Sequence, residues 1–176
     1  DKKAKSLPQQ RCLNLCQEGG YSNACKALVK PPPLDNTSAV HQQLKDKHPN
    51  AQPLDLTSLG PANCAMVQTP SCDDVERSIR SFHKLSGGGP SALRPLHLQE
   101  ALTPESRDEV LLHLTSLVSL LARGEAPPEI APCLAGASLM ALPKKDNGVR
   151  PIAVGETLRC LTSKCLCSSA ESKALD

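Results

Sequence analysis

The segment 137–167 constrains the fold of this chain more than any other stretch. Two short apolar runs, SLMAL and VRPIAV, flank an Asp-Asn-Gly sequence at 146–148. Asn-Gly is a strong hairpin signal because both residues tolerate positive φ. We therefore expect a β-hairpin that pairs 137–143 with 149–154 and is followed by a helix over 156–168.

Positive charge gathers around this turn. Lys144, Lys145 and Arg150 flank it, so their cationic groups can converge on one anion. Arginine can clasp a phosphate with its planar guanidinium, and lysine acts as a mobile point charge. The residues alone leave two interpretations open: a hairpin that binds phosphate, or an exposed hairpin whose charges keep it soluble.

Apolar periodicity predicts further helices at 8–18, 21–29, Thr37 or Ser38 to about Lys47, 73–83, 93–102 and 105–122. Ser71 and Asp74 fit a capping box at the start of one of them. The inner faces of the last two are expected at Leu93, Leu96, His97 and Ala101, and at the row Val110, Leu114, Leu117 and Leu121 flanked by Leu111 and Val118. The segment 126–132 is expected to be a short connector.

The expected fold class is mainly α with one β-hairpin (α+β). Residues 1–70 are expected to be a helical extension and a proline-rich linker, partly disordered, and 71–176 to be the principal unit. The chain has 16 prolines, no Trp and two aromatic residues, Tyr21 and Phe82. Large aromatic side chains usually dominate core burial, so this core must be built from aliphatic residues and cysteine.

Charge and hydropathy narrow the function classes. The formal net charge is +2, so an anion site has to come from local clustering rather than from a globally basic chain. No run approaches 18 apolar residues, and the start has no secretory signal, so we expect no membrane span and an intracellular location, nucleus or cytoplasm. Both ends are expected to be cuts in a longer chain, since the first residue is not Met and the last residues form no cap.

The nine cysteines raise the possibility of zinc. Structural zinc needs two close ligand pairs. Cys12 and Cys16 have no second pair after them, and Cys165 and Cys167 have no partners. Reduced, buried thiols are therefore favoured over a zinc site or a disulfide framework, and no histidine carries a hydrolase signature.

Three glycines, 87–89, precede Pro90 and Ser91. The lysine that a phosphate loop needs after its glycines is absent, and the dinucleotide pattern is absent too. The glycines leave two interpretations open. They form a flexible linker between helices, or they allow an unusual backbone and the close approach of a partner.

The hairpin sequence LPKKDNGVRPIAVGETLRCLTSKCL resembles the fingers hairpin and following helix of reverse transcriptases from non-LTR-like retrotransposons. The family run is P-K-x-x-x-G-x-R-P-I-x-[VL]-x-x-x-L-R-[RK]-L-x-x-K. It is matched by Pro143, Lys144, Gly148, Arg150, Pro151, Ile152, Val154, Leu158, Arg159, Leu161 and Lys164, whereas Cys160 stands where Arg is common.

Two earlier stretches resemble the same family. GGGPSALRPLHLQEAL resembles a block in which a G-P-S-G-L-R-P loop leads into a helix, with Ala92 in place of the glycine. RCLNLCQEGGYSNACKALV resembles the segment before the polymerase domain. The resemblance therefore covers most of 11–167 and implies an incomplete fingers subdomain of a polymerase right-hand fold, with a helical N-terminal extension.

The resemblance also implies roles for the charges. Arg150, assisted by Lys144 or Lys145, would contact the triphosphate of an incoming deoxynucleotide. Arg159 and Lys164 would contact the backbone of an RNA template or DNA primer, or be structural. These partners come from the family and are expectations here.

Polymerases transfer nucleotides with two metal ions held by carboxylates, which in this family follow the hairpin. The adjacent acids of this chain, 73–74 and 108–109, precede it. We therefore expect no catalytic or metal-binding residue and no cofactor in this chain, with Mg²⁺ needed only by the complete polymerase, and no polymerase activity of the chain alone. The alternative is a non-enzymatic remnant of a decayed or co-opted retroelement that binds nucleic acid or another partner.

Overall fold

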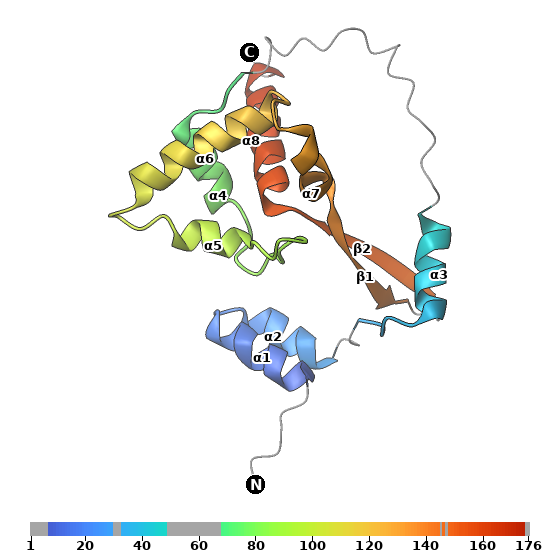
Figure 1. Cartoon of the computed structure of the whole chain (residues 1–176). Coiled ribbons are helices and arrows are strands. Elements are labelled where there is room, and N and C mark those ends of the chain that lie inside the picture. Colours follow the sequence, from blue (N-terminus) through green and yellow to red (C-terminus); the bar gives the residue numbers. More distant parts are fainter. Residues whose placement is uncertain (1–6, 30–32, 49–67, 145, 147, 175–176) are drawn as a thin grey trace. The chain divides into compact units, whose positions relative to one another are not determined.

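The computed structural model describes residues 7–29, 33–48, 68–144, 146 and 148–174. The chain divides into two compact units, each described by itself below. One comprises Asp1–Asn50 and Leu139–Ala153, and the other comprises Ala51–Ser138 and Val154–Asp176. The described chain is mostly helical with a two-stranded antiparallel sheet, which confirms the expected α+β class (Figure 1).

The first unit begins with a helical hairpin. Helix α1 spans Leu7–Gln17 and α2 spans Tyr21–Val29, close to the predicted ranges. Gly19 ends α1 with a φ of +75°, a conformation that glycine adopts without steric cost. The two helices pack on each other and bury Ala24.

Helix α3, Ser38–Lys47, starts where its cap was predicted. The Thr37 hydroxyl accepts a hydrogen bond from the Val40 backbone N–H at 3.3 Å. The segment before α3 is attached to the hairpin, because the Leu34 N–H donates to the Ala141 carbonyl at 2.8 Å. Most of the predicted linker, 49–67, lies outside the described residues, so a domain boundary at 70 and disorder there stay predictions.

The hairpin forms where the Asn-Gly signal placed it. Strand β1 spans Ala137–Pro143 and β2 spans Val149–Gly155. The prediction of 137–143 paired with 149–154 is therefore confirmed to within one residue.

The second unit is built on three helices that pack around one core (Figure 1): α4 (Cys72–Arg80), α6 (Arg107–Ala122) and α8 (Thr157–Ala174). Their shared core consists of aliphatic side chains and one thiol, as the composition required. Its members are Val75, Ile79, Leu98, Leu111, Val118, Leu161 and Cys165.

Several boundaries differ from the predictions. Helix α4 has the predicted capping box at Ser71 but ends at Arg80 rather than 83. Helix α6 begins at Arg107 rather than 105, because the Ser106 N–H and hydroxyl bond to Thr103 and hold a turn before the helix. The expected connector contains a short helix, α7 (Ala131–Ala135), preceded by a 3₁₀ turn at Pro128–Ile130, and α8 runs on past 168.

The two predicted inner faces are confirmed only in part, since Leu93 and Leu114 pack against the core but the most buried residues differ. Helix α5, Pro95–Glu100, buries Pro95 and Leu98, whereas His97 is exposed. The His97 ring accepts a hydrogen bond from the Arg94 N–H at 3.3 Å and so faces the start of the helix. Helix α6 buries Leu111 and Val118, which flank the predicted row, whereas the members of the row itself are partly buried.

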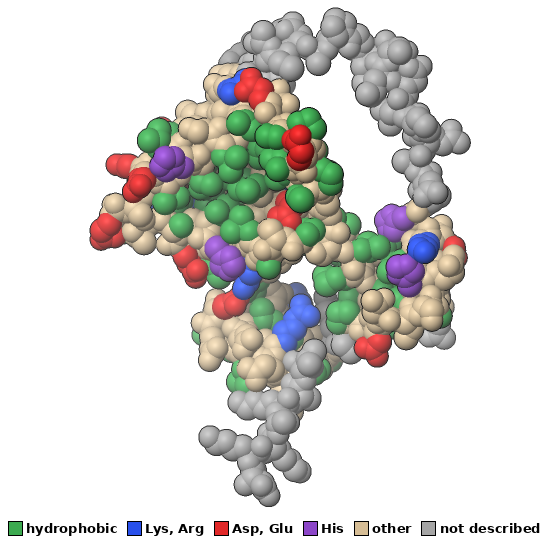
Figure 2. Space-filling model, in the orientation of Figure 1, with side chains coloured by type: hydrophobic (Ala, Val, Ile, Leu, Met, Phe, Trp, Pro, Cys, Tyr) green, Lys and Arg blue, Asp and Glu red, His purple; other side chains and the backbone are tan. Residues whose placement is uncertain are grey.

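Apolar surface is exposed on both units. On the face drawn in Figure 2, hydrophobic side chains gather over the unit of α4, α6 and α8. The large hydrophobic side chains exposed in that unit include Leu112 and Ile130, and those in the other unit include Leu13, Tyr21, Leu28, Val29, Leu139 and Met140. No helix in the described part of the chain is long and apolar enough to cross a membrane.

Candidate functional site

The hairpin presents two of the three predicted nucleotide-binding residues on one face. The Lys144 N–H donates to the Gly148 carbonyl at 2.9 Å, so these residues face each other across the turn. Side chains alternate along a strand, so Arg150 shares the face of position 148 and hence of Lys144. Val149 points to the other face and is buried, with 1% of its surface exposed. Lys145 lies outside the described residues.

Both cations are exposed to solvent. Within the described parts of the chain, neither Lys144 nor Arg150 forms an ion pair. The nearest acid in sequence, Asp146, accepts the Gly148 N–H at 3.2 Å and helps to shape the turn. This face can therefore offer two uncompensated positive charges to an anion.

The two residues predicted to contact nucleic acid belong to the second unit and lie on different faces of α8, five positions apart. Arg159 donates from Nη1 to the Ala135 carbonyl at 3.2 Å, so this carbonyl at the end of α7 has a hydrogen-bond partner. Lys164 donates from Nζ to the Ser81 hydroxyl at 2.9 Å, and its ammonium lies 4.9 Å from the centre of the Phe82 ring. Arg159 therefore caps the C-terminal end of α7, and Lys164 connects α8 to the end of α4.

The glycine-rich segment packs closely against the start of α8. A Cβ on Gly89 would lie 2.7 Å from the Gly155 carbonyl carbon, so only glycine can occupy this position without a shift of backbone. The Thr157 hydroxyl donates to the Leu93 carbonyl at 2.5 Å. Gly89 therefore allows a close approach within the chain itself, whereas approach to a partner and flexibility of the segment stay predictions.

The same contact is strengthened by a carboxylate. Glu156, 5% exposed, accepts the Ser91 backbone N–H at 2.7 Å and the Ser91 hydroxyl at 2.6 Å. These hydrogen bonds, the hydroxyl's first, lower the pKa of Glu156 below its ordinary value. The ionised carboxylate thus anchors the loop that bears Ser91 to the start of α8.

Ala92 has an unusual backbone conformation. Its φ is +60°, and it is the only non-glycine residue with positive φ in the described parts of the chain. This left-handed region strains any residue with a Cβ. Position 92 is the one at which the family block carries glycine.

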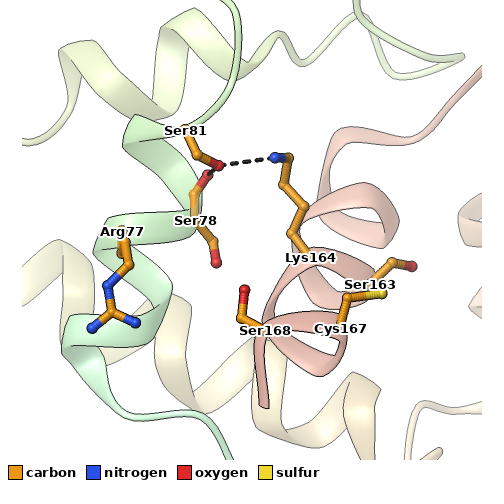
Figure 3. A pocket seen from close by; sticks show the side chains of 7 residues that line it. All are labelled: Arg77, Ser78, Ser81, Ser163, Lys164, Cys167 and Ser168. Atoms are coloured by element: carbon orange, nitrogen blue, oxygen red, sulfur yellow. Dashed lines mark hydrogen bonds between the residues drawn. The ribbon is translucent and has the colours of Figure 1, made fainter. Parts of the chain in front are cut away.

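A cleft between α4 and α8 was not predicted from the sequence. It has a volume of about 380 Å³ and is lined by Arg77, Ser78, Ser81, Ser163, Lys164, Cys167 and Ser168 (Figure 3). Sequence reasoning found only Lys164 among these residues. The sequence pattern that could have predicted the cleft is a cation followed four residues later by a serine. Among the lining residues it occurs as Arg77 with Ser81 and as Lys164 with Ser168.

The cysteines of the described segments form no disulfide. In those segments no group of three or more His, Cys, Asp or Glu residues could hold a metal ion. Cys165 is buried in the core, where burial raises the pKa of its thiol. Burial and the neighbouring Cys16 likewise raise the pKa of Cys12. A raised pKa favours the protonated form of these two thiols.

No protein-family model, curated protein or solved structure matches this chain. The likeness to reverse transcriptases accordingly depends on the motifs in the sequence.

Proposed function

We propose that this chain is the fingers region of a retroelement RNA-directed DNA polymerase. In this role the hairpin binds the incoming deoxynucleoside triphosphate, and neighbouring cations contact the template or primer. The observation that supports it most is the exposed face of the hairpin that carries Lys144 and Arg150 without ion-pair partners in the described chain.

The chemistry of nucleotide transfer suits this face. Charge develops on the pyrophosphate as it leaves, and fixed cations stabilise that charge. A guanidinium can hold two phosphate oxygens at once, and a lysine beside it adds a mobile charge. Arg150 is assigned the triphosphate oxygens, and Lys144 or Lys145 assists it.

The backbone of the glycine-rich loop supports the same assignment independently. The family block has glycine at the position that Ala92 occupies, and Ala92 has a φ of +60°. Glycine is the residue preferred where the backbone has a positive φ, so a positive φ is expected at this position of the family block. The conformation of Ala92 is therefore compatible with the glycine of the family block, which supports the proposal.

The remaining predicted residues divide into two roles. Arg159 is assigned a structural role, because its guanidinium donates to the Ala135 carbonyl. Lys164 is assigned to the phosphate backbone of the RNA template or DNA primer, because it donates to a neutral hydroxyl and keeps its charge uncompensated.

The carboxylates that hold the polymerase metals are assigned to sequence that follows the hairpin in the family. Asp74 serves a different purpose, because it accepts two hydrogen bonds from Ser71 and pairs with Arg77 at 3.1 Å. Mg²⁺ would therefore act only in the complete polymerase. Primer extension by this chain alone, with magnesium or manganese, would contradict the proposal.

Equilibrium binding of a fluorescent deoxynucleoside triphosphate tests the hairpin assignment. Arg150→Gln and Lys144→Gln are each expected to weaken binding about tenfold, the loss of one charge-assisted hydrogen bond. Lys26→Gln is the matched control, because Lys26 is an exposed lysine on α2 in the same unit. Equal affinity of the hairpin variants and the control, or equal affinity for triphosphate and monophosphate, would contradict the assignment.

A further inference from the structure

The cleft between α4 and α8 has the composition of a phosphate site. Its walls carry one guanidinium, one ammonium, four serine hydroxyls and one thiol, with no carboxylate among the lining residues. Hydroxyls and cations are the groups that donate to phosphate oxygens in proteins. The walls contain no large apolar side chain.

The lining residues lie in rows on the two facing helices. Arg77 and Ser81 are four apart on α4, and Lys164 and Ser168 are four apart on α8, so each pair shares one helix face. Figure 3 shows the hydroxyls of Ser78 and Ser168 directed into the space between the helices. The cleft stays open because serines occupy positions where larger side chains would fill it.

The charges of the cleft are only partly compensated. Arg77 pairs through Nη1 with Asp74 at 3.1 Å, which leaves its other N–H groups for a ligand. Lys164 donates to the Ser81 hydroxyl and forms no ion pair within the described segments. The Ser81 and Ser163 hydroxyls already donate to the carbonyls of Ser78 and Arg159. The cleft therefore keeps a net positive charge beside two hydroxyls, of Ser78 and Ser168, that can donate to a ligand.

We propose that this cleft binds a phosphodiester of a single-stranded RNA, with Lys164 and Arg77 neutralising the phosphate and the Ser78 and Ser168 hydroxyls completing its hydrogen bonds. The volume of about 380 Å³ admits a phosphate together with parts of its flanking riboses. The inference rests on the proposed function, since it gives Lys164 its backbone contact, and it adds Arg77 and Ser78, for which the motifs give no role.

The test is fluorescence anisotropy of a labelled single-stranded RNA with the full 176-residue chain over a range of salt concentrations. Lys164→Gln and Arg77→Gln are each expected to weaken binding about tenfold. Each should also reduce the slope of log K against log salt by about 0.7, the value for one phosphate contact to a single strand. Lys84→Gln, which removes an exposed lysine outside the cleft, should leave both quantities unchanged.

Two further variants separate loss of binding from loss of folding. Lys164→Arg keeps the charge and should restore most of the affinity. Ser168→Leu should fill the cleft and weaken RNA binding while the circular dichroism spectrum stays that of the wild type. Wild-type affinity and slope in Lys164→Gln, or an equal loss in Lys84→Gln, would overturn the proposal, and so would absence of RNA binding by the wild type.

Inorganic phosphate distinguishes the two possible sources of the anion. It should compete with the RNA only weakly at constant ionic strength, and saturable phosphate binding in the cleft without RNA binding would overturn the proposal. Binding of deoxynucleoside triphosphate is measured on the same variants and should not change. If Arg150→Gln leaves triphosphate binding intact while Lys164→Gln loses RNA, the hairpin assignment fails and the cleft assignment stands.

Discussion

Ser91 and Glu156 are 65 positions apart in the chain and are joined by two hydrogen bonds, of 2.7 and 2.6 Å, to the two carboxylate oxygens. One residue belongs to the glycine-rich loop, and the other directly precedes α8. Two stretches far apart in the sequence therefore meet in space. The contact is partly buried and engages both carboxylate oxygens, so it fixes how the loop is placed on α8.

This contact should contribute measurably to stability. Glu156→Ala leaves the Ser91 N–H without its acceptor and should lower the free energy of unfolding by about 2 kcal/mol, as for a hydrogen bond to a charged group. Urea unfolding followed by circular dichroism measures the change. Glu129→Ala, at an exposed acid, should change stability by less than about 0.5 kcal/mol. A double-mutant cycle with Ser91→Ala should show coupling, and strict additivity would argue against the contact.

Stability should depend on pH through the same carboxylate. The folded-state pKa of Glu156 is lowered by its hydrogen bonds with Ser91. The folded state therefore binds the proton less tightly than the unfolded state, and the contribution is present above the unfolded pKa of about 4.3 and is lost as pH falls through the folded value.

The comparison is between wild type and Glu156→Gln across the acid range. Wild type should lose more stability than the variant between neutral pH and the acid limit, because only wild type carries the Glu156 carboxylate. Asp74 and Glu76, whose pKa values are also lowered, titrate in both proteins, so their effect cancels in the comparison. If the free energy of unfolding falls equally with pH in the two proteins, Glu156 does not contribute to the pH dependence.

Ala92→Gly should stabilise the protein. Ala92 has a φ of +60°, which costs a residue with a Cβ about 1–2 kcal/mol. Part of the gain is offset by the flexibility of glycine in the unfolded chain, so we expect a net increase of about 1 kcal/mol in unfolding free energy. The matched control Ala122→Gly, at a helical position of α6, should destabilise by about 0.5–1 kcal/mol. A loss of stability in Ala92→Gly would contradict the left-handed conformation.

Gly89→Ala should be strongly destabilising. Its Cβ would lie 2.7 Å from the backbone of Gly155 and would force the loop away from α8. The expected cost is at least about 2 kcal/mol, in the range for overpacking of a close contact. Gly87→Ala is the control, since its nearest neighbour would be a Val154 methyl at 3.9 Å, an ordinary contact. Thermal unfolding of both variants gives the comparison, and similar midpoints would count against the close approach.

Local signals predicted local structure well. The Asn-Gly turn predicted the hairpin, Thr37 predicted the start of α3, and Ser71 with Asp74 predicted the capping box of α4. Each of these features depends on residues a few positions apart, whose hydrogen bonds form wherever the segment lies. Lys144 and Arg150 share a face for the same reason, because strand alternation is also a local property.

The buried face of α6 and the cleft between α4 and α8 depend on tertiary packing and could not be predicted from the sequence. Apolar side chains occur on most sides of α6, so the face it buries depends on where α4 and α8 pack. Leu111 and Val118 are therefore more buried than the predicted row that they flank. The cleft of Arg77 and Lys164 exists only because two helices 80 to 90 positions apart in the sequence face each other. Neither feature can be predicted from the residue spacing within a single segment.

Photo-cross-linking of an azido-substituted deoxynucleoside triphosphate to the 176-residue chain, followed by mass-spectrometric mapping, tests the nucleotide-binding role of the hairpin most directly. The account predicts that the modified peptides fall within 137–155, that excess unlabelled triphosphate suppresses the modification, and that Arg150→Gln reduces it. Modification confined to peptides outside 137–155, or insensitive to Arg150→Gln, would contradict it.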